Sequence, residues 1–196
     1  MAERGKAHHP RKLEIVHAAV ACFLERGYHQ TGVRDIATRA GISLGNLYNH
    51  FAGKDAVLVF IAEMEGEELS GFIDLLSEPD SPKDALERFI ERYAVWSATP
   101  ENALLGIEIL TEALRNPPIA EVFEKNRNRL IDAIVACLGR GVQSGVFSAE
   151  NDPREAALLI LDGLEGYGLR AVSGGAPSQK SAGSIKNLIF NGLAAG

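Results

Sequence analysis

The feature that most constrains the fold is a run of residues 31–58, in which two short helical patterns are separated by a glycine. Glycine readily takes the left-handed conformation that ends a helix and turns the chain, and Gly41 stands at that point. The pattern before the turn has apolar residues at helical spacing, which predict a helix of about two turns. These residues are Val33, Ile36, Ala37 and Ala40.

A second short helix is predicted over residues 44–50, after Ser43, whose side chain is a good N-cap. Leu47 and Phe51 lie four residues apart, so both fall on the face that packs against the first helix. Two helices joined in this way form a helix-turn-helix. The outer face of the second helix carries small, amide and ring side chains: Gly45, Asn46, Tyr48, Asn49 and His50.

The same stretch contains a motif of many positions at fixed spacing. Its members are Thr31-Gly32-Val33, Ile36-Ala37, Ala40-Gly41-Ile42-Ser43, Gly45-Asn46-Leu47-Tyr48, His50-Phe51 and Lys54-Asp55. This motif resembles the signature of the tetracycline-repressor (TetR) family of transcriptional regulators. Beyond residue 60 the resemblance is one of architecture. The resemblance implies DNA binding through the second helix, dimerisation through the last two helices and an inducer pocket in the body.

The rest of the chain has helical periodicity without strand alternation, so we expect an all-α fold of about nine helices. A helix-turn-helix head over residues 1–55 precedes a larger ligand-binding and dimerisation domain over residues 56–196. The first helix ends at Gly27, Tyr28 belongs to the core, and Thr31 is expected to cap the next helix. The other helices are predicted over residues 11–26, 54–76, 82–98, 101–115, 119–141, 153–172 and 178–193.

Charge is distributed unevenly along the chain. The net charge of −6 divides into +3 over residues 1–55, which also hold all five histidines, and −9 over residues 56–196. A basic head on an acidic body confines the attraction for phosphate to one end. Residues 1–10 form a polar arm that either reaches DNA or is solvated.

Composition excludes several classes of protein. The content of 46% hydrophobic and 23% charged residues is that of an ordinary globular protein, and no apolar run is long enough for a membrane helix. Cys22 and Cys137 lie in separate apolar patterns, which indicates reduced core residues and a cytoplasmic location. No histidine follows residue 50, so the body lacks the means for a triad or a metal–histidine site, and we expect neither an enzyme nor a cofactor.

Candidate DNA contacts lie in and around the helix-turn-helix. Amide side chains pair well with adenine, whereas a tyrosine hydroxyl and a lysine at a helix N-terminus suit phosphates. The resemblance implies the same phosphate-clamping roles for Tyr48 and Lys54. Arg34 and Arg39 either contact phosphate or are simply solvated, and His50 either contacts DNA or packs. The predicted set is Thr31, Arg34, Ser43, Leu44, Gly45, Asn46, Tyr48, Asn49, His50 and Lys54.

One such head offers few base-reading side chains, so a dimer on a two-fold related site is expected. The last two helices offer an apolar seam for a second copy, although they could instead only close the core of the body. Glycines in this seam suggest close backbone approach. The predicted interface consists of Leu159, Ile160, Gly163, Tyr167, Ile185, Leu188 and Ile189.

A ligand pocket in the body is also predicted, from aromatic and apolar residues. Phe89, Tyr93 and Trp96 share one helical face, and this is explained either by core packing or by an apolar pocket. The candidate lining is Phe89, Tyr93, Trp96, Leu110, Phe123, Arg127 and Tyr167. Glu108 and Glu112 are expected to form a solvated stripe with Arg115 rather than a site.

The sequence therefore predicts a dimeric DNA-binding regulator, a repressor released from a palindromic operator by a small apolar ligand. In the alternative, the acidic body binds a protein partner instead of a small molecule.

Overall fold

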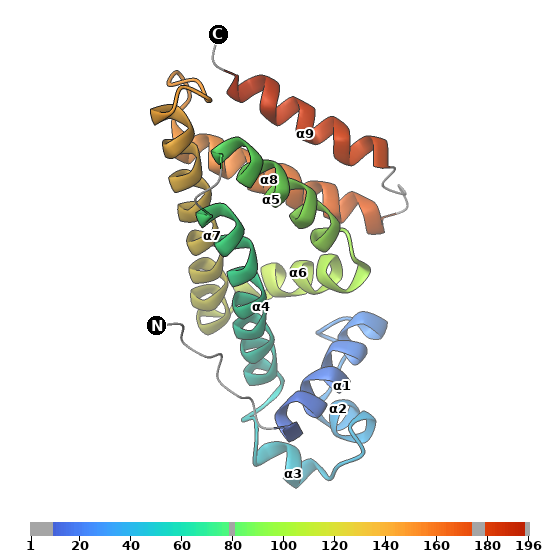
Figure 1. The fold of residues 1–196 in the computed structure, drawn as a ribbon. Helices are drawn as coiled ribbons and strands as arrows, with labels where there is room; N and C mark the ends of the chain where they lie inside the picture. Colours follow the sequence, from blue (N-terminus) through green and yellow to red (C-terminus); the bar gives the residue numbers. More distant parts are fainter. Residues whose placement is uncertain (1–9, 79–80, 174–178, 195–196) are drawn as a thin grey trace. The chain divides into compact units, whose positions relative to one another are not determined.

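A computed structural model describes residues 10–78, 81–173 and 179–194, with the side chains of residues 179–182 excepted. Over these residues the regular secondary structure is helical, apart from one isolated antiparallel bridge between Phe147 and Ala194. This confirms the predicted all-α class (Figure 1). The helices are α1 (Pro10–Arg26), α2 (Val33–Arg39), α3 (Leu44–Tyr48), α4 (Lys54–Ser77), α5 (Pro82–Ser97), α6 (Pro100–Ala113), α7 (Pro117–Gln143), α8 (Pro153–Val172) and α9 (Gln179–Leu193).

The predicted helix bounds hold closely. Helix α8 spans the predicted residues, and Asp152 caps it by accepting hydrogen bonds from the backbone amides of Arg154 and Glu155. Helix α3 ends earlier than expected, at Tyr48, with Asn49 as its C-cap. The predicted N-terminal arm, the middle of the predicted linker and the break before α9 lie outside the described residues. None of the described helices is both long and apolar enough to cross a membrane.

Contacts divide the chain into two compact units. One consists of Met1–Glu67 with Leu105–Glu124, and the other of Glu68–Leu104 with Lys125–Gly196. Helices α4, α6 and α7 therefore each contribute residues to both units. The division into a head over residues 1–55 and a body over residues 56–196 stays a functional prediction.

The first unit packs α1 to α3 around a single apolar core. Phe23 of α1, Ile36 of α2 and Leu47 of α3 are all buried there, because each lies on the inward face of its helix. Two buried residues from distant parts of the sequence, Ile109 of α6 and Ile119 of α7, complete the same core.

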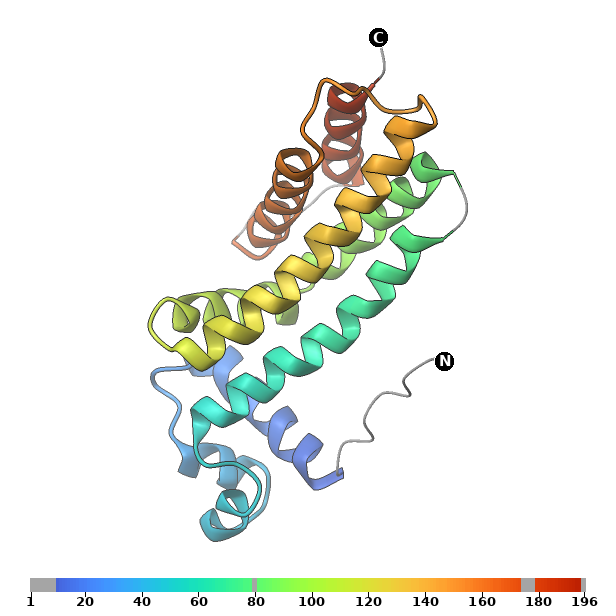
Figure 2. The ribbon, with the colours of Figure 1, turned by 90° about the vertical axis from the view of Figure 1, so that its left-hand side faces the viewer.

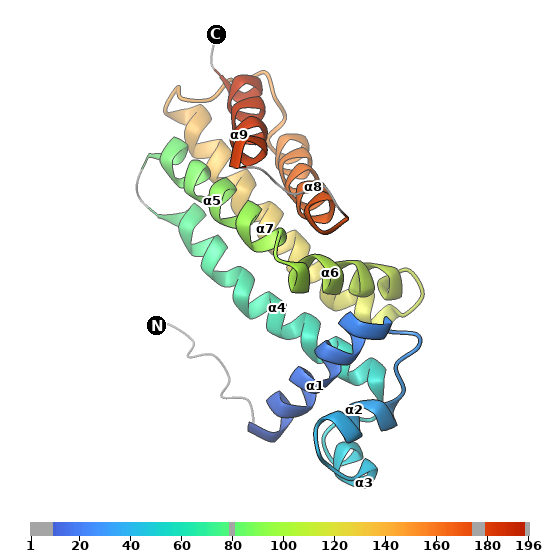
Figure 3. The same cartoon turned by 90° about the vertical axis from the view of Figure 1, so that its right-hand side faces the viewer.

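The second unit has α5 beside α8, with α9 against both (Figure 3). The later part of α7 runs along the end of α4 (Figure 2), and the Arg129 guanidinium donates a 3.1 Å hydrogen bond to the Ser70 hydroxyl. The α5–α8 crossing is close. A Cβ atom on Gly168 would lie 2.3 Å from the backbone oxygen of Ser97, so only glycine allows the two backbones to approach this far.

Candidate nucleic-acid interface

The turn between α2 and α3 has the geometry that the sequence predicts. Gly41 adopts φ +66°, and its amide donates to the backbone oxygen of Thr38 at 3.1 Å. The amide of Ile42 donates to the oxygen of Ala37 at 3.0 Å, so the last carbonyls of α2 are satisfied by the turn itself. Ser43 then caps α3 by accepting a hydrogen bond from the Asn46 amide at 3.2 Å, as predicted.

Helix α3 has one buried face and one open face. Leu47 and Phe51 are buried against the core, whereas Tyr48 is 52% exposed and Asn49 is exposed as well. No heavy atom lies within 4 Å of the position that a Cβ atom on Gly45 would take, so a partner can approach the backbone closely there. Asn46 and His50 are half-buried at the edges of the open face, and Leu44 is half-buried against the core.

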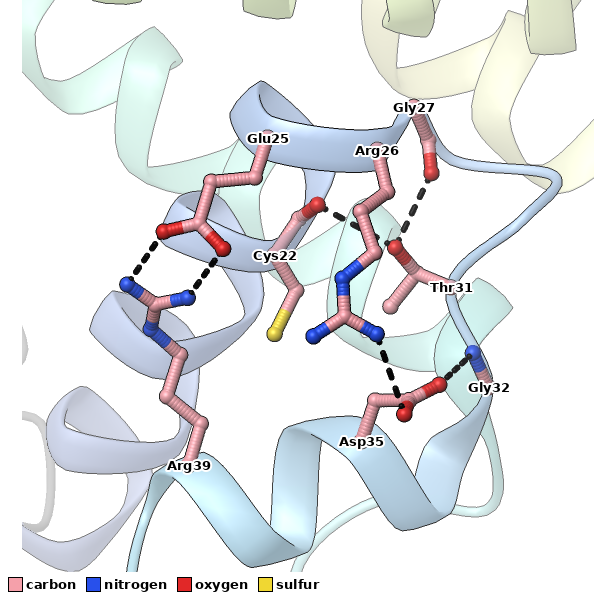
Figure 4. Close-up of polar contacts among 8 residues, drawn as sticks. All are labelled: Cys22, Glu25, Arg26, Gly27, Thr31, Gly32, Asp35 and Arg39. Carbon is pink, nitrogen blue, oxygen red and sulfur yellow. Dashed lines mark hydrogen bonds and ion pairs between the residues drawn. The ribbon is translucent and has the colours of Figure 1, made fainter.

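Thr31 differs from its prediction in two ways. The N-cap of α2 is Gly32, and the Asp35 carboxylate accepts a 2.8 Å hydrogen bond from the Gly32 amide (Figure 4). The Thr31 side chain is 1% exposed, and its hydroxyl is directed at the backbone oxygens of Cys22 and Gly27, at 3.2 and 2.9 Å. The predicted cap was therefore wrong. The hydroxyl joins the segment before α2 to the end of α1 instead of facing a phosphate.

The arginines around α2 have different environments. The Arg39 guanidinium makes two 2.6 Å hydrogen bonds with the Glu25 carboxylate of α1 and holds the pKa of Glu25 below its usual range (Figure 4). The Gly32 amide lowers the pKa of Asp35, helped by Arg26 at 3.2 Å. Arg34 is exposed and forms no ion pair with any of the described residues. Of the two predicted arginines, Arg34 is thus the better placed for phosphate.

Lys54, the first residue of α4, is bound to the turn that follows α1. Its ammonium donates a 2.8 Å hydrogen bond to the backbone oxygen of Tyr28 and lies 4.2 Å from the centre of the Tyr28 ring. The buried Tyr28 hydroxyl donates to the Asp55 carboxylate, and burial together with that carboxylate raises the pKa of Tyr28. An ammonium has three donors, so Lys54 keeps donors for a further acceptor.

Contacts from α6 and the following turn hold the same region, and no local pattern of residues indicated them. The Asn116 side-chain amide donates to Asp55 at 3.3 Å, and His29 Nε2 lies 2.8 Å from Glu112 Oε1. The expectation of a solvated Glu108–Glu112–Arg115 stripe was wrong, because Glu112 is buried by packing against the turn after α1. Arg115 donates instead to the backbone oxygen of Thr111.

The predicted pocket residues are divided between the two units. Phe89 and Tyr93 are buried in the core of the second unit, where Phe72 meets the Tyr93 and Trp96 rings edge-on at centroid distances of 5.3 and 5.7 Å. Core packing accounts for Phe89 and Tyr93, whereas Trp96 is half-buried at the edge of that core. Leu110 is 49% exposed and belongs to the first unit, so its place in a pocket between helices stays a prediction.

The remaining candidates are also divided between the two units. Phe123 packs against the core of the first unit. Arg127 is bound by Glu165, with both oxygens at 2.7 Å, and by Asp162. Tyr167 packs partly buried against the core of the second unit.

Four of the predicted dimer residues meet on one surface. Leu159 of α8 and Leu188 of α9 are 71% and 74% exposed, and both line a cleft with Ile160 and Ile189. Packing within one copy of the chain does not account for such exposure of large apolar side chains, which is typical of contact surfaces.

Together, the helix-turn-helix, the open face of α3 and the nearby cations define a DNA-binding protein of the helix-turn-helix class. Comparison with known proteins agrees with this class. Residues 15–59 match the family model described as bacterial regulatory proteins, tetR family. The repressor KstR2 of Mycobacterium tuberculosis is 33% identical over 72% of this chain and 72% of its own length. UidR of Escherichia coli K12 is 29% identical over 78% and 77%.

Solved structures show the same fold. GusR of Salmonella enterica superposes with a TM-score of 0.78 at 25% identity, covering 96% of this chain and 99% of its own. FadR of Bacillus subtilis, solved in complex with stearoyl-CoA, gives a TM-score of 0.79 at 22% identity over 92% and 98%. The chain belongs to the TetR family of transcriptional regulators.

Proposed function

We propose that this chain is a homodimeric repressor that inserts α3 into the major groove of a palindromic operator and is released by a small, largely apolar ligand. The observation that carries the proposal is the open face of α3, where Tyr48 and Asn49 are exposed beside the unobstructed backbone of Gly45. Asparagine amides can donate to and accept from adenine, and a glycine lets the helix backbone approach the groove.

Phosphate contacts would fix the position of α3 in the groove. Tyr48 and Arg34 are exposed, and Lys54 begins α4 just after the helix-turn-helix. Phosphate contacts supply most of the salt-dependent affinity without reading sequence. Operator binding should therefore weaken steeply as salt rises.

A second copy would provide the second half-site. The exposed Leu159 and Leu188, on adjacent helices, support dimerisation through α8 and α9, since mutual burial would remove both from water. The two-fold symmetry of such a dimer matches a palindrome, with half-sites about 34 Å apart along the helix axis.

The relatives support a ligand as the signal. FadR of B. subtilis was solved with stearoyl-CoA bound, and we infer that the body of this chain also takes a ligand with a large apolar part. Ligand binding would favour a conformation in which the two heads no longer match successive major grooves. A cytoplasmic location follows from this role.

The test begins with fragments selected from genomic DNA by the purified protein. On a selected fragment, Tyr48→Phe combined with Lys54→Ala should weaken binding, and the loss of the lysine charge should flatten the salt dependence by about one unit of log–log slope. Lys83→Ala, a change of an exposed lysine in α5, is the matched control and should leave both quantities unchanged. Unchanged affinity and slope in the double variant would refute the clamp. Capture of a stable protein complex with no response to small molecules would favour the protein-partner alternative.

A further inference from the structure

A second cleft, separate from the open face of α3 and from the exposed leucines of α8 and α9, lies on the second unit. It is formed between the last part of α4 and the middle of α5 and has a volume of about 670 Å³, within the range of small-molecule sites. Its lining comes from one face of each helix: Glu68, Gly71, Phe72 and Leu75 of α4, and Glu91, Arg92, Val95 and Trp96 of α5.

The floor of the cleft is apolar and partly aromatic. Phe72 and Trp96 meet with a centroid distance of 5.7 Å and an interplanar angle of 66°, so their rings present both a face and an edge. Val95 is 71% exposed at the rim, and Leu75 lies buried beneath. No heavy atom lies within 4 Å of a Cβ position on Gly71, which keeps one wall open. A hydrocarbon body that filled this space would remove these surfaces from water.

The two carboxylates of the cleft already have partners. Glu68 accepts a 3.3 Å hydrogen bond from the Trp96 indole nitrogen across the cleft. Glu91 forms a 2.7 Å ion pair with Lys186 of α9, which also pairs with Glu87 at 2.5 Å. Glu68 is thus held by a neutral donor, and Glu91 shares the single ammonium of Lys186 with Glu87, so a cationic ligand would have to displace these contacts.

Arg92 is the charged residue of the lining that remains available. It is exposed, and it forms no hydrogen bond or ion pair with any residue in the described ranges. A guanidinium cannot lose its charge at physiological pH, and its planar donors match a carboxylate or a phosphate. The cleft thus combines an apolar floor with one unpaired cation at its edge.

We propose that this cleft binds an amphiphilic anion, with a hydrocarbon body over Phe72 and Trp96 and a terminal carboxylate at Arg92. The assignment deepens the proposed function, on which it rests for its physiological meaning, because such a ligand would be the effector of the regulator. Binding itself does not require DNA, so the two proposals can fail separately.

The chain contains one tryptophan, and that residue is Trp96 in the cleft. Intrinsic fluorescence of the full-length protein therefore reports on this site directly. Decanoate, decanol and decylammonium, each below its micelle concentration, share a chain and differ in charge. Decanoate should shift the Trp96 emission at the lowest concentration, and decylammonium at the highest. Equal or tighter binding of decylammonium would overturn the proposal.

Two variants sharpen the test. Arg92→Gln should weaken decanoate binding about tenfold, the effect of losing a charge-assisted hydrogen bond, and leave decanol binding unchanged. Arg170→Gln, a change of an exposed arginine on α8, is its matched control and should bind decanoate as the wild type does. Decanoate binding that is indifferent to Arg92→Gln would contradict the assignment.

Gly71→Leu tests the apolar floor without loss of folding, since leucine is a better helix former than glycine and nothing obstructs its Cβ atom. The leucine side chain would occupy the cleft, and binding of both decanoate and decanol should be lost. Gly139→Leu on α7, also unobstructed, is the control that should retain binding. If decanoate binds as described but leaves operator affinity unchanged, the site stands and the effector role in the proposed function fails.

Discussion

The ammonium of Lys54 is 2.8 Å from the backbone oxygen of Tyr28 and 4.2 Å from the centre of its ring, so the residue that opens α4 is fastened to the turn after α1. The Tyr28 hydroxyl in turn donates to Asp55, which also accepts from Asn116. Four residues from three parts of the sequence thus fix the start of α4 beside the helix-turn-helix. This arrangement makes Tyr28 a sensitive position for both stability and DNA binding.

Tyr28→Phe removes the hydroxyl and keeps the ring under Lys54. We expect a loss of about 1–2 kcal/mol in the free energy of unfolding at pH 7, towards the low end for a hydrogen bond to a charged group because Asp55 is exposed. Urea denaturation monitored by circular dichroism measures it.

The difference in unfolding free energy between the wild type and Tyr28→Phe should depend on pH. The pKa of Tyr28 is raised in the folded state, so the folded protein binds its proton more tightly than the unfolded chain, whose tyrosines titrate near pH 10. The stabilisation is complete below about pH 10 and is lost above it, by up to about 1.4 kcal/mol per pH unit. The advantage of the wild type over Tyr28→Phe should therefore shrink above pH 10. A difference that stays constant to pH 11.5 would show that the hydroxyl is not held as described.

Gly168→Ala tests the close crossing of α5 and α8. The added methyl group would lie 2.3 Å from the Ser97 oxygen and 2.9 Å from the Ser97 Cβ, so the helices must separate. We expect destabilisation by about 1–3 kcal/mol, typical of overpacking. Gly166→Ala, two residues earlier on the same helix, meets nothing within 4 Å and should instead stabilise by up to about 1 kcal/mol. Thermal denaturation of the pair gives opposite shifts if the crossing is as close as described.

Gly41→Ala and Gly45→Ala separate stability from DNA affinity. Gly41 adopts φ +66°, which costs alanine about 1 kcal/mol, so this variant should be less stable. Gly45 is helical and unobstructed, so Gly45→Ala should be at least as stable as the wild type. Fluorescence anisotropy on a selected operator should nevertheless show weaker binding for Gly45→Ala, because the methyl group lies on the face proposed to enter the groove. Full affinity in a stable Gly45→Ala protein would argue against that close approach.

Arg127→Met removes the cation that two carboxylates of α8 share. Glu165 then loses its compensation, and burial already raises its pKa despite the nearby guanidinium. Since Glu165 is partly exposed, solvent screens the loss, and we expect about 1 kcal/mol of destabilisation at pH 7. A raised folded pKa favours the folded state at low pH, so the deficit should shrink as pH falls towards 5. Adding Glu165→Gln should restore part of the stability at pH 7. If stability is not restored, the destabilisation by Arg127→Met does not arise from the Glu165 carboxylate.

Features encoded by neighbouring residues could be predicted from the sequence. Gly41 and Ser43 determine the turn and the cap of α3 through their own backbone and side chain, and the spacing of Leu47 and Phe51 defines the buried face. The exposed leucines of α8 and α9 were likewise recognisable, because they extend the apolar face of their helices beyond what the monomer buries.

Features that depend on distant contacts could not be predicted. Thr31 has the residue type of a cap, but the end of α1 offers two carbonyls to its hydroxyl and turns it inward. Glu112 has the spacing of a solvated stripe, but α6 packs against the turn that carries His29. Leu110 lies on an apolar helix, and no periodicity could show that its side chain is 49% exposed.

The two units of this chain are interleaved along the sequence, since the boundary between them is crossed after Glu67, after Leu104 and after Glu124. Ile109 and Ile119, from the inserted segment, are among the buried residues of the first unit. A fragment cut after Glu67 would expose the apolar surface that these two residues cover. DNA-binding specificity therefore cannot be exchanged between relatives by joining two chains at a single junction. A chimaera that retains an intact first unit needs three junctions. Recombination at a single point would combine core residues of the first unit from two different proteins.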